Sequence, residues 1–288
     1  MPPGRIDVVA TPIGNLADLS PRAREALAAA DVIAAEDTRH TGNLLRQLGV
    51  QRPLLSLHDH NELQRREELL ERLRAGARVA LVSDAGTPLV SDPGYLLVRA
   101  AIEAGVTVQA VPGASAVLVA LAVSGLSAER FCFEGFLPSR PAARRERLRA
   151  LRHEPRTQIF FEAPHRIGET LEDMAAEYGE ERHACVAREL TKMHESVYRG
   201  SFAQLLQIAR DEANFARGEI TLVVAGNESV DAAPDDAFVA RAYELLAAEL
   251  PPSRAASLVA QLTGRRKSEV YARGIRPHGA PVAQEGEE

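Results

Sequence analysis

Asp37 and Arg39 have the residue types and spacing that acid–base chemistry on a hydroxyl group requires. They follow the apolar stretch 32–36, where a buried strand is expected to end. A carboxylate there could accept a hydroxyl proton, while a guanidinium could hold a phosphate or fix the carboxylate. The alternative is that Asp37 caps a helix beginning near Thr38. We take Asp37 and Arg39 as candidate catalytic residues.

A second charged pair, Glu189 and Lys192, follows the apolar stretch 184–188. Lys192 is one of only two lysines in the chain, which makes its position at a strand end more informative. Its ammonium could lower the pKa of an acceptor hydroxyl or bind a phosphate. An ordinary surface lysine is the competing interpretation, and the sequence favours neither. Glu189 and Lys192 are the other two candidate catalytic residues.

The sequence does not predict a metal site. One polar run has suitable ligand types but lacks a fourth ligand and a recognised spacing, so a substrate-facing loop or a polar turn is expected there. This run contains His58, Asp59, His60 and Glu62. The two cysteines, Cys132 and Cys185, lie in apolar surroundings far apart in the sequence, which is typical of inert buried thiols.

Three loops rich in glycine and proline are expected to form the cleft at which these side chains must lie. They span residues 11–16, 83–94 and 111–116, and each follows an apolar run and precedes a helical pattern. Ligands of open α/β sheets bind beyond the carboxyl ends of the strands. Glycine allows close backbone approach and proline stiffens a turn. We therefore expect the three loops to line one binding crevice.

Strand and helix patterns alternate along the chain as far as residue 226, which indicates an α/β protein with largely parallel pairing in its first part. We expect an N-terminal α/β lobe over 1–112 and a second α/β lobe over 113–226. A linker then leads to a small helical module over 235–277, split by Pro251 and Pro252. We expect residues 278–288 to be a disordered tail.

Composition restricts the class of protein. The chain has 288 residues, of which 45% are hydrophobic, and a formal net charge of −6, which argues against non-specific coating of nucleic acid. No apolar run approaches the roughly 18 residues of a membrane span. Residues 1–5 lead directly into a strand, so we expect no signal peptide, no membrane association and a cytoplasmic location.

Positive charge is nevertheless concentrated in two segments, 138–156 and 264–278. The first holds seven arginines: Arg140, Arg144, Arg145, Arg147, Arg149, Arg152 and Arg156. The second holds Arg265, Arg266, Lys267, Arg273 and Arg276. Both segments could contact a polyanion, or both could be solvated helix faces, and charge alone does not decide between these interpretations.

Five motifs, in order and spacing, resemble the tetrapyrrole methylase superfamily over roughly residues 5–275. These motifs lie at 11–16, 35–39, 83–88, 161–166 and 188–192. The resemblance implies two α/β lobes that flank a cleft for S-adenosyl-L-methionine, and it implies a homodimer. The positions matching the cofactor-binding residues of the family are Pro12, Ala85, Gly86, Thr87, Val90, Ser115, Ala116, Glu162 and Leu190.

Within the superfamily, the motifs are similar to those of the branch that methylates the ribose 2′-hydroxyl of a cytidine in the decoding region of 16S ribosomal RNA. The expected partner is that RNA, within the assembled small subunit. A tetrapyrrole precursor or another small molecule is the alternative acceptor, and a non-catalytic RNA-binding protein is a further alternative. A Rossmann dehydrogenase would need Gly-x-Gly-x-x-Gly after the first strand, where this chain has residues 11–16 instead.

Overall fold

The computed structural model describes residues 4–58, 60–227 and 236–274, with backbone alone for 236–237 and 272–274. The first lobe is built on a five-stranded sheet in the order β3-β2-β4-β1-β5, with every pair parallel. This confirms the parallel pairing predicted from the sequence. The strands are β1 (Arg5–Val9), β2 (Val32–Ala35), β3 (Leu54–Ser56), β4 (Arg78–Val82) and β5 (Thr107–Val111).

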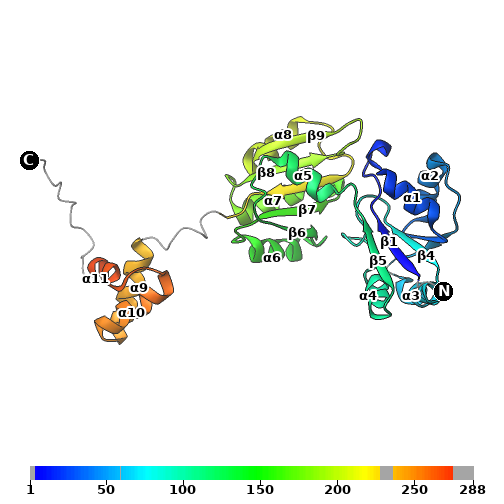
Figure 1. The fold of residues 1–288 in the computed structure, drawn as a ribbon. Coiled ribbons are helices and arrows are strands. Elements are labelled where there is room, and N and C mark those ends of the chain that lie inside the picture. Colours follow the sequence, from blue (N-terminus) through cyan, green and yellow to red (C-terminus); the bar gives the residue numbers. More distant parts are fainter. Residues whose placement is uncertain (1–3, 59, 228–235, 275–288) are drawn as a thin grey trace, which may run out of the picture. The chain divides into compact units, whose positions relative to one another are not determined.

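Helices cover both faces of this sheet (Figure 1). α1 (Pro21–Ala29) and α2 (Thr38–Leu48) pack on one face, and α3 (Glu62–Arg74) and α4 (Tyr95–Glu103) pack on the other. Local signals set the helix ends: the Ser20 hydroxyl accepts a hydrogen bond from the Ala23 amide at the start of α1, and α2 ends at Gly49 with φ +69°. Coverage of both faces explains why β2 and β4 are continuous apolar runs.

The second lobe has a mixed sheet in the order β6-β7-β10-β8-β9. Its strands are β6 (Phe131–Phe136), β7 (Thr157–Glu162), β8 (His183–Arg188), β9 (Ser196–Ser201) and β10 (Ile220–Val224). β6 pairs with β7 in parallel, and the other neighbours are antiparallel. α6 (Pro141–Leu151), α7 (Ile167–Tyr178) and α8 (Phe202–Asp211) cover one face, and α5 (Ala116–Ser124) covers the other.

The first and second lobes meet on the α5 side of the second sheet. Ile13, from the loop after β1, is buried in the same apolar cluster as Leu121 of α5 and Leu190 of the loop after β8. Residues 1–226 accordingly form one compact unit. The loops that follow β1 and β8 are thus held against each other by a shared core.

The helices beyond residue 227 form a second compact unit. It contains α9 (Asp236–Glu249), α10 (Pro252–Thr263) and α11 (Lys267–Gly274), which pack around Val239, Tyr243, Val259 and Val270. The predicted tail over 278–288 lies outside the described residues. Across the described part of the chain, no helix is both long and apolar enough to span a bilayer.

Candidate functional site

Hydrogen bonds join the three glycine- and proline-rich loops at the carboxyl edge of the first sheet. The Thr11 amide donates to the Gly86 carbonyl at 2.9 Å, and the Gly86 amide donates to the Thr11 carbonyl at 3.1 Å. The Thr87 hydroxyl donates to the Ala114 carbonyl at 3.1 Å. All three loops contribute walls to one cavity, so the expected single crevice is confirmed.

This cavity, of about 460 Å³, lies within the size range of small-molecule sites. We call it the carboxylate cavity because five acidic residues line it: Glu36, Asp84, Asp92, Glu162 and Glu219. Apolar and aromatic side chains complete the walls, among them Ile13, Val90, Val117, Phe136 and Phe161. No lysine, arginine or histidine of the described chain lines it, so it is suited to a ligand with both positive charge and an apolar part.

Most of the positions expected to bind cofactor reach this cavity. Those that line it are Ala85, Gly86, Thr87, Val90, Ser115, Ala116 and Glu162. Pro12 lines an adjoining cavity instead, and Leu190 is buried against Ile13 and lines neither. For all nine of these positions, contact with a cofactor stays a prediction.

Two of the five acidic side chains are held in contrasting ways. Glu162 is fully engaged by the protein: it accepts hydrogen bonds from the Thr170 hydroxyl and the Ala163 amide, each at 2.7 Å, and pairs with Arg166 at 3.2 Å. Burial raises the pKa of Asp92. A hydrogen bond with the Ser83 hydroxyl opposes this upward shift, and the negative charge of Asp84 adds to it. The cavity therefore holds carboxylates close enough to repel one another, and a bound cation would relieve that repulsion.

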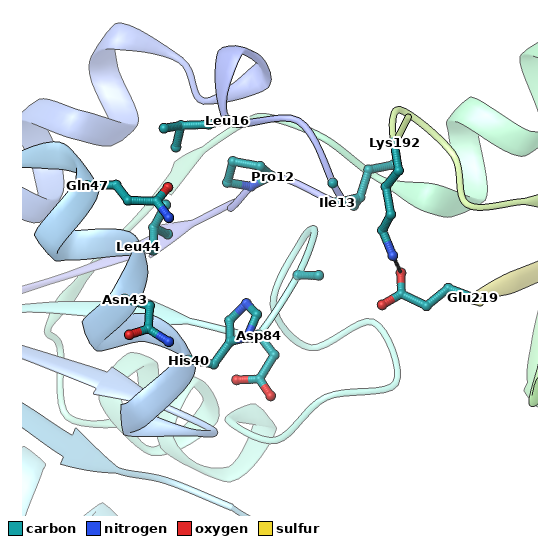
Figure 2. Close-up of a pocket in the computed structure, with 12 residues that line it drawn as sticks. Pro12, Ile13, Leu16, His40, Asn43, Leu44, Gln47, Asp84, Lys192 and Glu219 are labelled. Carbon is teal, nitrogen blue, oxygen red and sulfur yellow. Dashed lines mark ion pairs between the residues drawn. The ribbon is translucent and has the colours of Figure 1, made fainter. Parts of the chain in front are cut away.

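The adjoining cavity, of about 420 Å³, lies against one side of α2, and we call it the α2 cavity. Its lining comprises Pro12, Ile13, Gly14, Leu16, His40, Asn43, Leu44, Gln47, Asp84, Ala85, Lys192 and Glu219. Figure 2 shows the α2 side chains facing the 12–16 loop, with Lys192 and Glu219 across from them. Four residues line both cavities: Ile13, Asp84, Ala85 and Glu219. Asp84 and Glu219 are therefore the carboxylates at the junction.

Lys192 is held at this junction by two carboxylates. Its Nζ lies 2.9 Å from Glu189 Oε1 and 3.1 Å from Glu219 Oε2 (Figure 2 shows the second pair). The Glu219 amide also donates to Glu189 Oε1 at 2.8 Å. Burial acts to lower the pKa of Lys192, but the two carboxylates outweigh it and the net shift is upward. Lys192 is thus a fixed cation, and Glu189 holds it in place without lining either cavity.

Asp37 and Arg39 do not line either cavity. Asp37 caps α2, accepting hydrogen bonds from the Arg39 and His40 amides. The Arg39 side chain, 90% exposed, pairs with Asp37 at 3.0 Å, and this pairing lowers the pKa of Asp37 to about 2. Such a carboxylate is a poor proton acceptor near neutral pH. The Asp37 amide donates to Asp84 Oδ1 at 3.0 Å, so this segment positions Asp84, which was not among the residues predicted from the sequence.

Backbone strain is concentrated in two of the loops around the cavities. Leu89 and Ser91 have φ values of +75° and +67°, and Glu189 and Thr191 have +51° and +65°. Non-glycine residues rarely adopt this region, and such strain often accompanies functional sites. A methyl group built on Gly14 would lie 2.3 Å from Lys192 Cγ. The 12–16 loop is therefore so close to the loop after β8 that a side chain at position 14 would clash with Lys192.

Five of the seven arginines in the segment 138–156 pair with carboxylates. Arg144 is buried between Asp173 at 2.6 Å and Glu169 at 3.2 Å. Four further arginines of the segment also pair with carboxylates: Arg145, Arg147, Arg149 and Arg156. Burial removes Arg144 from a polyanion contact, whereas a role of the other arginines of this segment in such a contact stays a prediction.

Within the polar run at 58–62, Glu62 has a structural role. Glu62 is buried and accepts hydrogen bonds from the Gly94 amide at 3.0 Å and the Leu96 amide at 2.9 Å, at the start of α4. The predicted contribution of Asp59 lies outside the described residues. Among residues 4–58, 60–227 and 236–274, no group of three or more His, Cys, Asp or Glu side chains is arranged to hold a metal ion.

Comparison with known families gives two matches that together span most of the chain. Residues 5–206 match the model of the Tetrapyrrole (Corrin/Porphyrin) Methylases. Residues 231–276 match the RsmI C-terminal HTH domain. The boundary between the two matches agrees with the division of the structure near residue 226.

Individual relatives are similar over nearly their whole length. A protein of Xylella fastidiosa (strain Temecula1) named ribosomal RNA small subunit methyltransferase I is 55% identical over 93% of this chain and 98% of its own. A protein of Escherichia coli O157:H7 with the same name is 47% identical over 96% of both chains.

Solved structures show the same fold at lower identity. The methyltransferase CobJ aligns with a TM-score of 0.58 at 22% identity, over 77% of this chain and 94% of its own. Uroporphyrin-III C-methyltransferase from Thermus thermophilus, solved with S-adenosyl homocysteine, aligns with a TM-score of 0.53 at 18% identity, over 76% of this chain and 97% of its own.

Proposed function

The chain belongs to the tetrapyrrole methylase family, among the ribosomal RNA small subunit methyltransferases I, and we propose that it transfers a methyl group from S-adenosyl-L-methionine to 16S ribosomal RNA. The acceptor in this proposal is the ribose 2′-hydroxyl of a cytidine in the decoding region, as the sequence motifs imply. The single observation that carries the mechanism is that two cavities of suitable size meet at Asp84 and Glu219.

The carboxylate cavity suits the cofactor. S-adenosyl-L-methionine supplies a methyl group on a positively charged sulfur, together with an adenosine. Asp84 and Asp92 would favour the positive charge, and Phe161 and Val90 offer apolar surface to the nucleoside. A structural relative was solved with S-adenosyl homocysteine, the demethylated form. We assign cofactor contacts to the predicted residues that line this cavity and to Asp92.

Asp84 is our candidate for the general base. It lines both cavities, and its Oδ1 already accepts the Asp37 amide, which leaves Oδ2 for an acceptor hydroxyl. Glu219 also lines both cavities but is paired with Lys192. A ribose hydroxyl is a weak nucleophile, so a carboxylate that accepts its proton as the new bond forms should accelerate transfer.

Lys192 is our candidate for the electrostatic partner of the developing oxyanion. Its upward pKa shift keeps it positively charged, so it acts by charge and not as a base. The remaining requirement is that the hydroxyl be aligned with the carbon–sulfur bond. Two adjoining cavities meet this requirement because each holds one reactant. Glu189 is a positioning residue in this scheme.

The partner in our proposal is 16S ribosomal RNA within the assembled small subunit, which places the reaction in the cytoplasm. A homodimer is expected from the family resemblance. The C-terminal helical unit is the part of the chain best suited to hold RNA outside the active site, because the exposed side chains of Arg266 and Lys267 have no carboxylate partner in the described residues.

The deciding experiment is transfer of labelled methyl from S-adenosyl-L-methionine to purified small subunits from a strain lacking the modification, with nuclease mapping of the product. We expect label on one ribose in the decoding region. Cofactor binding without transfer to subunits or to naked ribosomal RNA would contradict the proposal and favour a small-molecule acceptor.

A further inference from the structure

We propose that the α2 cavity holds the base of the target nucleotide and that Asn43 and Gln47 recognise it through the exocyclic amine of cytosine. This inference rests on the proposed function and names the residues that select the acceptor. It would make one face of α2 the specificity element of the enzyme.

The two amides lie on the cavity side of α2. His40, Asn43, Leu44 and Gln47 have the spacing that places side chains on one helix face, and all four line the α2 cavity. Figure 2 shows them in succession along that side of the helix. Neither amide has a hydrogen-bond partner among the described residues, so both retain their full donor and acceptor capacity for a ligand.

The charges of the cavity favour a neutral base over a phosphate. Asp84 and Glu219 are acidic, and the charge of Lys192 is already shared between two carboxylates. A phosphate would lie against that acidic wall, whereas a cytosine presents an amine that donates hydrogen bonds. Pro12, Leu16 and Leu44 add the apolar surface that an unstacked base requires.

The geometry of the junction gives the base and the ribose separate positions. Asn43 and Gln47 come from α2, whereas Asp84 and Lys192 come from the loops after β4 and β8. A nucleoside with its base against α2 would direct its ribose toward the junction, where the proposed base and cation lie. A side-chain amide can donate to the ring nitrogen of cytosine and accept from its amine, and this pairing fails when the amine is absent.

The test is a double-mutant cycle between the amide pair and the amine of the target base. Small subunits are reconstituted with ribosomal RNA carrying either cytidine or pyrimidin-2-one riboside, which lacks the amine, at the target position. Methyl transfer is measured for the wild type, for Asn43→Ala/Gln47→Ala and for Gln64→Ala. Gln64 is a matched control, since it is an exposed helical glutamine of the same lobe that lines neither cavity.

We expect loss of the amine to reduce kcat/KM of the wild type and of Gln64→Ala by about tenfold or more. The double variant should be slower on cytidine by a similar factor and should distinguish the two targets by less than about twofold. Its affinity for S-adenosyl-L-methionine, measured by calorimetry, should match that of the wild type.

Three outcomes would overturn the inference. If amine removal slowed the double variant as much as the wild type, the amides would not read the amine. If the double variant lost cofactor affinity, the α2 cavity would belong to the cofactor. If the wild type itself modified neither target, the proposed function would fail as well. The first two outcomes leave methyl transfer by the wild type intact, so a failure of the inference alone is distinguishable from a failure of the proposed function.

Discussion

The arginines of α6 and the charges at the cavity junction look equally suggestive in the sequence, yet their surroundings differ. Arg144 is buried and its partners, Asp173 and Glu169, belong to the same lobe, so its charge is used to join α6 to α7. Lys192 is also paired, but it lines the α2 cavity, which Asp84 lines as well. Because Lys192 has access to a cavity and Arg144 does not, we choose Lys192 as the functional candidate.

The largest effect should come from Asp84→Asn. This change keeps the acceptor for the Asp37 amide but removes the proton-accepting carboxylate, so we expect kcat to fall by about 10²- to 10⁴-fold. Thermal stability should change little. Methyl transfer to small subunits measures the effect, with Asp211→Asn on α8 as a control for loss of an exposed carboxylate. Near-normal turnover would remove Asp84 from the chemistry.

Lys192→Met should lower kcat by about 10²- to 10³-fold, since it removes the cation beside the developing oxyanion and leaves two carboxylates unopposed. Cofactor affinity should be largely retained, and Lys192→Arg should recover part of the rate. Single-turnover transfer separates chemistry from binding. A variant with normal kcat and a raised KM for subunits would instead make Lys192 an RNA-binding residue.

Arg144→Met should show the opposite pattern. Removing the buried guanidinium leaves Asp173 with Arg145 alone, at 3.4 Å, so we expect the free energy of unfolding to fall by about 1–3 kcal/mol. Turnover per folded molecule should stay at the wild-type value. Urea unfolding and methyl transfer, measured on the same preparation, test both statements. A loss of activity without a loss of stability would contradict the structural role assigned to Arg144.

The two basic segments can be separated by the salt dependence of subunit binding. We expect Arg266→Glu/Lys267→Glu to reduce the slope of log K against log salt by about 1 for each RNA phosphate that the variant no longer binds. Arg149→Glu should leave the slope close to that of the wild type, because Arg149 already pairs with Glu177 at 2.9 Å. Equal slopes for the two variants would remove the C-terminal unit from the RNA interface.

The smallest effect is expected for Asp37→Asn, which keeps an efficient cap on α2 and loses an exposed ion pair. Turnover should stay close to that of the wild type, contrary to the role that the sequence suggested. Because the pKa of Asp37 is lowered to about 2, the folded state loses its contribution as pH falls from the ordinary carboxyl range toward 2. Acid unfolding of wild type and variant should therefore converge at low pH.

The fold and the location of the site could be predicted from local signals, whereas the roles within the site depend on distant contacts. Apolar runs followed by glycine- and proline-rich loops predicted the crevice. β9 was not predicted, because Ser196–Ser201 lacks an apolar run and is stabilised by pairing with β8. The role that we propose for Asp84 was not predicted, because only the folded chain brings it to Asp37, 47 residues away.

The left-handed backbone at Thr191 has a consequence for how this protein tolerates sequence change. Thr191 has φ +65°, a conformation that glycine adopts without strain, so Thr191→Gly would be expected to relieve local strain. The same change would loosen the loop that fixes Lys192 against Gly14. Selection for thermal stability and selection for turnover would therefore favour different residues at position 191.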